Sequence, residues 1–148
     1  MVSSTESETS IRALGEVVLR VRDLPAMTAF YEKVLGLTAL RRFERSVFFR
    51  IAPSFAGHTQ MLALFDQSIP PNHPEVRHDG LDALQSPLHH FAFAIGLEDY
   101  YRERVRLEGL GLTVRLDEHH WVKCRSLYIR DPEGNVIELV CYDQEVVS

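Results

Sequence analysis

The sequence is organised as two similar halves, and this internal repeat limits the folds that the chain can adopt. In the first half Glu16 opens the apolar stretch EVVLRV, and a helical stretch ending in GLT follows it. In the second half His90 opens HFAFAI, and a second helical stretch again ends in GLT. The two copies lie about 75 residues apart, half of the chain. Further apolar stretches follow each helix, so each half is predicted to form a strand, a helix and three strands.

Both helical stretches carry local signals. Asp23 can cap the first helix, and Gly36 can end it. In the second, Leu97, Tyr101 and Val105 recur at helical spacing, while Arg and Glu residues lie between them. We therefore expect these three residues to form the apolar face of the helix and the charged residues to face solvent.

The repeat also sets the expected domain organisation. We predict a disordered tail over 1–12, a first module over 13–66, a linker over 67–86 and a second module over 87–148, together forming one structural domain. The linker is rich in proline and polar residues, which is typical of a surface connection. With 148 residues, 45% of them hydrophobic, the chain is long enough to bury a core.

The composition excludes some partners and favours others. The net charge is -5 with acids and bases mixed along the chain, which argues against nucleic acid and against a basic membrane-binding surface. No apolar run approaches the roughly 18 residues that span a bilayer, and the first residues lack the pattern of a signal peptide. We expect a soluble cytoplasmic protein that binds a small molecule.

One residue marks a candidate site. Glu138 interrupts the apolar stretch VIELV, and burial of an unpaired carboxylate is costly. Side chains alternate between the two faces of a strand, so Glu138, His90, Glu16 and Arg20 are each predicted on the face away from the helix. This pattern predicts a cavity lined by polar side chains. The alternative is a structural role, in which the two carboxylates pair with Arg20 and other polar groups and His90 is a core histidine with its hydrogen bonds made.

The chain resembles the vicinal oxygen chelate superfamily, which contains glyoxalase I, extradiol dioxygenases, and fosfomycin and bleomycin resistance proteins. The resemblance covers residues 13–142 and is carried by EVVLRVRDLPAMTAFYEKVLGL, HHFAFAI and RSLYIRDPEGNVIELV. It implies an α+β fold of two βαβββ modules in tandem, with curved mixed sheets enclosing a cavity. It also implies a divalent metal that substrate oxygens chelate.

Carried over to this chain, the family's metal ligands fall on Glu16, Ala63, His90 and Glu138. Ala63 cannot bind a metal, and Glu16 stands where many members have histidine. The resemblance therefore implies Glu16, His90 and Glu138 as ligands. One imidazole and two carboxylates suit Fe, Mn, Ni, Co or Zn.

The remaining expectations concern substrate and reaction. Arg20 and Tyr128 are candidate substrate contacts, as are Tyr142 and His119, the last placed in a loop before the seventh strand. Glu16 is a candidate general base as well as a candidate ligand. The reaction expected first is metal-dependent lyase or isomerase chemistry on a small oxygenated molecule. The alternatives are an extradiol-type, ring-cleaving dioxygenase and a metal-free protein that binds a drug or metabolite. A homodimer is expected in each case.

Overall fold

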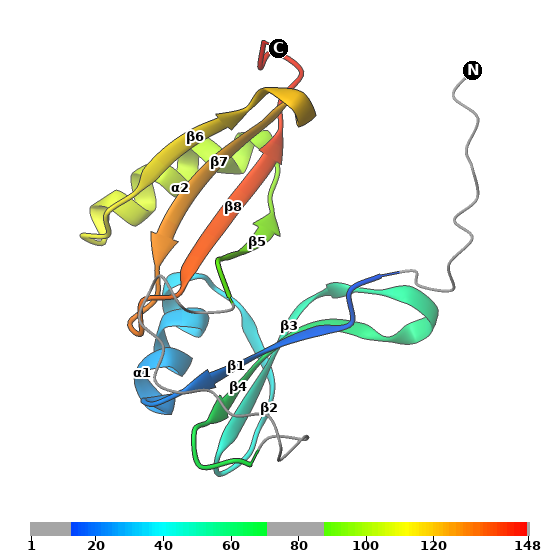
Figure 1. Ribbon diagram of the computed structural model, residues 1–148, viewed down its shortest axis with the longest axis vertical. Helices are drawn as coiled ribbons and strands as arrows, with labels where there is room; N and C mark the ends of the chain where they lie inside the picture. The colour runs from blue at the N-terminus through cyan, green and yellow to red at the C-terminus, as the bar shows by residue number, and fades with distance from the viewer. Residues whose placement is uncertain (1–12, 71–87, 148) are drawn as a thin grey trace. The chain divides into compact units, whose positions relative to one another are not determined.

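The computed structural model describes residues 13–70 and 88–147. The chain divides into two compact units between Ile69 and Pro70, and each unit contains one four-stranded sheet (Figure 1). The proposed tail 1–12 and residues 71–86 of the proposed linker lie outside the described residues. No helix within the described ranges is long and apolar enough to cross a membrane.

The first unit forms a mixed sheet in the order β1-β4-β3-β2. Strand β1 runs parallel to β4, and the other neighbours are antiparallel. Its elements are β1 (Glu16–Val21), α1 (Leu24–Ala29), a π-helical turn (Phe30–Val34), β2 (Thr38–Arg42), β3 (Ser46–Pro53), a 3-10 turn (Phe55–Gly57) and β4 (Thr59–Asp66).

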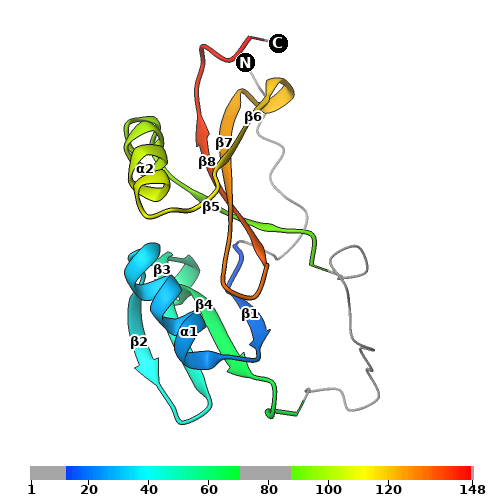
Figure 2. The ribbon, with the colours of Figure 1, turned by 90° about the vertical axis from the view of Figure 1, so that its left-hand side faces the viewer.

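The second unit repeats this topology in the order β5-β8-β7-β6, with β5 parallel to β8 (Figure 2). Its elements are β5 (Phe91–Ala94), α2 (Leu97–Gly109), β6 (Arg115–His119), a 3-10 turn (His120–Val122), β7 (Cys124–Arg130) and β8 (Val136–Tyr142). The two four-stranded mixed sheets confirm the predicted tandem βαβββ modules.

The first helix follows its sequence signals at both ends. The Asp23 carboxylate accepts a hydrogen bond from the Ala26 backbone N–H at 3.0 Å. The helix widens to a π-helical turn at Phe30, and the chain leaves it through Gly36 at φ +75°. A positive φ at this place favours glycine, so Gly36 ends the helix as predicted.

Aromatic and aliphatic side chains of the first helix fill the core against β3 and β4. Met27, Tyr31, Phe49 and Leu62 are all fully buried. The Tyr31 and Phe49 rings lie 6.3 Å apart, which joins the helix to the middle of the sheet.

Truncation of Phe49 to alanine is expected to destabilise the protein by about 3–5 kcal/mol, because the substitution removes a fully buried ring and leaves a cavity. Chemical denaturation would measure the change in the free energy of unfolding. Phe55→Ala is the matched control, because the Phe55 side chain is 60% exposed and its loss is expected to cost less than about 0.5 kcal/mol. Equal losses in the two variants would contradict the packing described here.

The apolar face predicted for α2 is wrong. Leu97, Tyr101 and Val105 are 36%, 54% and 71% exposed, whereas Tyr100 and Leu107 are buried. The Tyr100 hydroxyl donates a hydrogen bond to the Ser126 carbonyl of β7 at 3.2 Å. Tyr100 therefore lies on the face of α2 that packs against the sheet. The exposed residues form an apolar stripe along the outer side of α2.

The hairpin between β7 and β8 fixes where β8 begins. The Asp131 carboxylate accepts hydrogen bonds from the backbone N–H groups of Glu133, at 2.9 Å, and Asn135, at 3.0 Å. Gly134 adopts φ +86°, the conformation expected of a glycine in this turn. The turn sets the register in which Glu138 lies opposite Tyr128.

Candidate functional site

The candidate site lies on the face of the second sheet that is opposite α2. Register places Ala92 of β5 beside Glu138 of β8, Glu138 beside Tyr128 of β7, and Tyr128 beside Arg115 of β6. The first sheet has the same arrangement, with Val18 beside Ala63. Ala63 thus occupies in the first unit the place that Glu138 occupies in the second, as the sequence repeat predicts.

His90 and Glu138 are in direct contact on this face. His90 immediately precedes β5, and its Nε2 atom lies 3.1 Å from Oε2 of Glu138. The Glu138 side chain is 9% exposed and that of His90 is 34% exposed. A buried carboxylate therefore presents one oxygen to a histidine that solvent can reach.

The second oxygen of Glu138 is held by hydroxyl groups of β7. The Ser126 hydroxyl donates a hydrogen bond to Oε1 at 2.5 Å, and the Tyr128 hydroxyl lies 3.4 Å from the same atom. Ser126 is fully buried. These contacts compensate the burial of the carboxylate and fix its orientation. Sequence reasoning missed Ser126, although its even spacing from Tyr128 along one strand places it on the same face.

Tyr128 is a neutral phenol in this setting. Its partial burial raises the pKa of the hydroxyl, and the nearby Glu138 carboxylate raises it further. The hydroxyl lies 3.0 Å from Nε2 of His119, and the same nitrogen lies 3.5 Å from Oε1 of Glu138. Tyr128 can therefore donate a hydrogen bond at neutral pH and connects His119 to the carboxylate.

His119 does not lie in a loop, so that part of the prediction is wrong. It is the last residue of β6, and the 3-10 turn begins only at His120. Antiparallel pairing extends β6 as far as the contact between His119 and Cys124. Because β6 continues to this point, the imidazole lies on the same face as Glu138.

A pocket of about 840 Å³ opens on this face, within the size range of small-molecule sites. All of its lining residues belong to the second unit. They are His89, His90, Gly111, Leu112, Thr113, Arg115, Leu116, Asp117, Tyr128, Ile129, Arg130 and Val136. Tyr142 does not line this pocket; it is 64% exposed and borders a smaller hollow with Leu97.

His89 adds a second imidazole at the mouth of the pocket. Its Nδ1 atom lies 2.6 Å from Nδ1 of His90, and the two rings meet edge to face. In a pair this close, one nitrogen carries the proton and the other accepts it.

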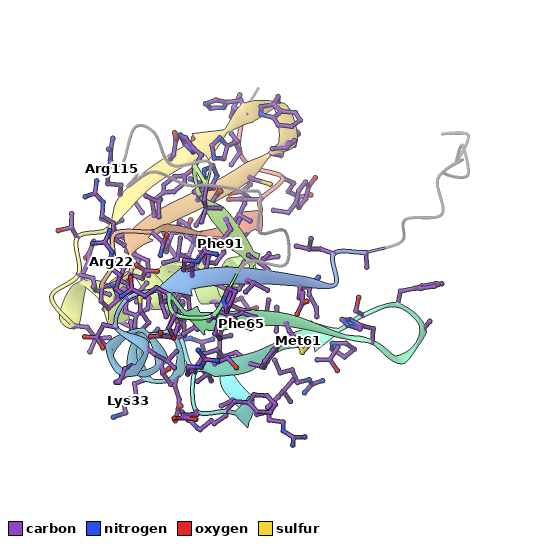
Figure 3. The ribbon with its side chains drawn as sticks, turned by 60° about the horizontal axis from the view of Figure 1, so that its bottom comes forward. Arg22, Lys33, Met61, Phe65, Phe91 and Arg115 are labelled. Carbon is purple, nitrogen blue, oxygen red and sulfur yellow. The ribbon has the colours of Figure 1, made fainter. Side chains whose placement is uncertain are left out.

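Glu16 and Arg20 belong to the first unit. Both lie on the exposed face of β1, with Glu16 beside Met61 and Arg20 beside Phe65 of β4 (Figure 3 labels Met61 and Phe65). Neither has an ion-pair partner among residues 13–70 and 88–147. Ala63 is fully buried and offers no ligand atom.

The geometry of His90 and Glu138 fits a divalent metal as two neighbouring ligands. Metal bonds to imidazole nitrogen and carboxylate oxygen are about 2.0–2.2 Å long, so two ligands at right angles lie about 3 Å apart. The observed separation of 3.1 Å matches this spacing. Among the described residues no three histidine, cysteine, aspartate or glutamate side chains are grouped to hold an ion. A complete site would therefore take further ligands from solvent or from substrate.

Fold and site together define a protein of tandem βαβββ modules with a histidine–glutamate pair on the face of the second sheet opposite α2. The model of the Glyoxalase/Bleomycin resistance protein/Dioxygenase superfamily matches residues 13–139. The chain belongs to this family, as the sequence resemblance predicts.

Three relatives illustrate the match. Glutathione transferase FosA of Serratia marcescens is 25% identical over 132 residues, which cover 87% of this chain and 80% of that protein. Lactoylglutathione lyase from Agrobacterium tumefaciens is 30% identical with a TM-score of 0.64, over 90% of this chain and 96% of that chain. A glyoxalase/dioxygenase from Nostoc punctiforme has a TM-score of 0.65 at 23% identity, over 97% of this chain and all of that chain, which shows the shared fold.

Proposed function

We propose that this protein is a divalent-metal-dependent enzyme that carries out lyase or isomerase chemistry on a small oxygenated molecule. The observation that carries the proposal is the pair of His90 Nε2 and Glu138 Oε2, 3.1 Å apart, beside a pocket of small-molecule size. Membership of the family supports this proposal, and so does the similarity to a lactoylglutathione lyase.

His90 and Glu138 would hold the metal, with Glu16 as the proposed third protein ligand. When bound, the metal supplies Lewis acidity that stabilises negative charge on a substrate oxygen. Ser126 and Tyr128 keep the Glu138 carboxylate in place through their hydroxyl groups. Because outer hydrogen bonds of this kind orient metal ligands, Ser126 acts as a positioning residue.

Glu16 is also the proposed general base. In this role its carboxylate takes a proton from the carbon next to the substrate carbonyl and returns it to the neighbouring carbon. The proton balance then needs no outside acceptor. Arg20 lies on the same face of β1, four residues along, and is the proposed cation that faces substrate there.

A metal-free binding protein is the second candidate, and two observations favour it. Ala63 cannot bind a metal, and the described residues hold no three-residue ligand group. In that case His90 and Glu138 form a partly buried ion pair that lines a binding pocket. The ring-cleaving dioxygenase stays an alternative that requires iron, and no contact described above favours it.

Proton exchange at carbon tests the proposal. Small α-hydroxycarbonyl compounds would be incubated in deuterated water with the purified protein, and NMR would follow loss of the signal of the proton next to the carbonyl. The proposal predicts exchange that depends on added divalent metal and disappears with a chelator. Tight binding of such compounds without exchange, at any metal concentration, would favour the binding protein instead.

We also propose a homodimer, and the exposed stripe of α2 supports this state. A two-fold axis at Tyr101 that pairs α2 with its copy in antiparallel orientation brings Leu97 against Val105 and Glu98 against Arg104 of the second copy. Nε of Arg104 already lies 3.3 Å from Oε1 of Glu108 in its own helix. In the dimer Arg104 would therefore exchange Glu108 for Glu98 of the second copy, or contact both. The self-complementary pattern of apolar and charged residues fits a second copy of this chain.

Tyr101→Arg is expected to convert the dimer to a monomer, because it places two like charges at the two-fold axis. Light scattering of the purified protein would measure the mass. Leu110→Arg is the control, since Leu110 is 56% exposed and caps the same helix away from the stripe. A monomeric unmodified protein, or a dimer that tolerates Tyr101→Arg, would contradict this interface.

A further inference from the structure

Two arginine side chains border the pocket beside His90 and Glu138. Arg115 opens β6 and Arg130 ends β7, and both side chains are exposed to solvent. Neither has an ion-pair partner among the described residues. Figure 3 shows Arg115 extending from the outer strand of the second sheet. Two guanidinium groups without acidic partners at one pocket are a feature that the proposed metal chemistry does not use.

The strand register places the two arginines close enough to act together. Arg115 lies directly beside Tyr128, and Arg130 follows Tyr128 by two residues on the same face. Residues related in this diagonal way on neighbouring strands lie about 7–8 Å apart at the backbone. The long arginine side chains can therefore converge on one small group between them.

The side chains that line the pocket carry more positive than negative charge, although the net charge of the protein is -5. The pocket lining includes the two arginines and the imidazoles of His89 and His90. Asp117 is the single acidic residue of the lining, and its Oδ1 atom accepts a hydrogen bond from the Glu118 backbone N–H at 2.8 Å. The local field thus favours an anion over a cation or a neutral molecule.

We propose that Arg115 and Arg130 bind an anionic group of the substrate, either a carboxylate or a tetrahedral phosphonate or phosphate. The guanidinium groups donate charge-assisted hydrogen bonds to its oxygen atoms. The reacting end of the same molecule then lies towards His90 and Glu138. This placement of the reacting end rests on the proposed function, whereas the anion site does not depend on a metal.

The spacing of the sheet limits the size of such a substrate. Arg115 lies on β6 and Glu138 on β8, with only β7 between them. Neighbouring strands are about 4.8 Å apart, so these two positions are separated by about 10 Å at the backbone. The arginine side chain shortens this gap further. A compact molecule with its anionic group a few bonds from the reacting carbon fits this span.

The test is a titration of the whole protein with three probes, namely inorganic phosphate, methylphosphonate and acetate, in the presence of EDTA. NMR signals of the arginine side-chain N–H groups would report binding. We expect saturable binding of at least one probe, weakened at least about tenfold in Arg115→Gln and in Arg130→Gln, since a hydrogen bond to a charged group is worth about this factor. Arg102→Gln is the control, because the Arg102 side chain lies on α2 and is 72% exposed.

The probes and variants give distinct outcomes. Preference for phosphate and methylphosphonate assigns a tetrahedral anion, and preference for acetate assigns a carboxylate. Absence of saturable binding by any probe, or equal binding by Arg115→Gln, Arg130→Gln and the unmodified protein, would overturn the proposal. Glu138→Gln should still bind the probe. If the protein binds the anion but binds no divalent metal, the proposed enzyme function is wrong and the proposed anion site is supported.

Discussion

Glu138→Gln is expected to lower the affinity of the protein for Mn²⁺, Co²⁺ or Zn²⁺ by more than about 100-fold and to abolish metal-dependent activity. The substitution keeps the size of the side chain and removes the charge of a proposed ligand. Loss of an outer partner of a metal ligand costs about 10- to 100-fold in affinity, and loss of the ligand itself should exceed this range. Calorimetric titration of the metal-free protein would measure the change.

Two further variants make the result of this substitution interpretable. Ser126→Ala removes the hydroxyl that donates to Oε1 of Glu138 and should weaken metal binding by the smaller factor of about 10- to 100-fold. Glu145→Gln removes an exposed carboxylate at the far end of β8 and should leave the affinity unchanged. A Glu138→Gln protein that folds and binds metal as the unmodified protein does would remove Glu138 from the ligand set.

Glu16→Gln is expected to slow proton exchange at substrate carbon by about 10²- to 10⁴-fold, the usual contribution of a general base. Metal affinity measured on the same variant separates the two roles proposed for Glu16. If Glu16 is only the base, the metal binds as before while exchange slows. If Glu16 is a ligand, metal affinity falls together with the rate.

The matched control for Glu16 is Glu44→Gln, which alters another exposed glutamate of the first unit. It should change neither the exchange rate nor the metal affinity. Full exchange activity in Glu16→Gln would show that the base is a different residue. The His119 imidazole, whose Nε2 atom lies 3.0 Å from the Tyr128 hydroxyl, would then be the next group to replace.

Apolar stretches explain why strands β1 and β8 could be predicted from the sequence. The stretches EVVLRV and VIELV predict strands β1 and β8 to within two residues of their observed ends, because a short run of mostly apolar residues is typical of a strand. Alternation of side chains along the strand puts Glu138 on the sheet face opposite α2, where the structure holds it beside His90. The repeat of the two halves then gives the topology of both units.

The extent of strand β6 could not be predicted in the same way. Its sequence, RLDEH, is polar, and four of its five residues are exposed. A strand at the edge of a sheet needs no apolar alternation, so its pairing with β7 leaves no trace in the local sequence. For this reason the sequence predicts a loop at His119, and it predicts neither Arg115 nor its position next to Tyr128.

Helix α2 was assigned correctly, but its orientation was not. Its apolar residues fit two different faces, one through Leu97, Tyr101 and Val105 and another through Tyr100 and Leu107. Spacing alone cannot choose between two faces of similar hydrophobicity. The hydrogen bond from Tyr100 to β7 favours the second face, and this contact depends on the tertiary structure.

The proposed function requires that His90 and Glu138 together bind a divalent metal. The most direct test is an electron paramagnetic resonance titration of the whole metal-free protein with Mn²⁺, compared with His90→Ala. The account predicts one tightly bound ion per chain in the unmodified protein and a large loss of affinity in the variant. Absence of Mn²⁺ binding by the unmodified protein, repeated with Fe²⁺, Co²⁺, Ni²⁺ and Zn²⁺ by calorimetry, would contradict it and leave a metal-free binding protein.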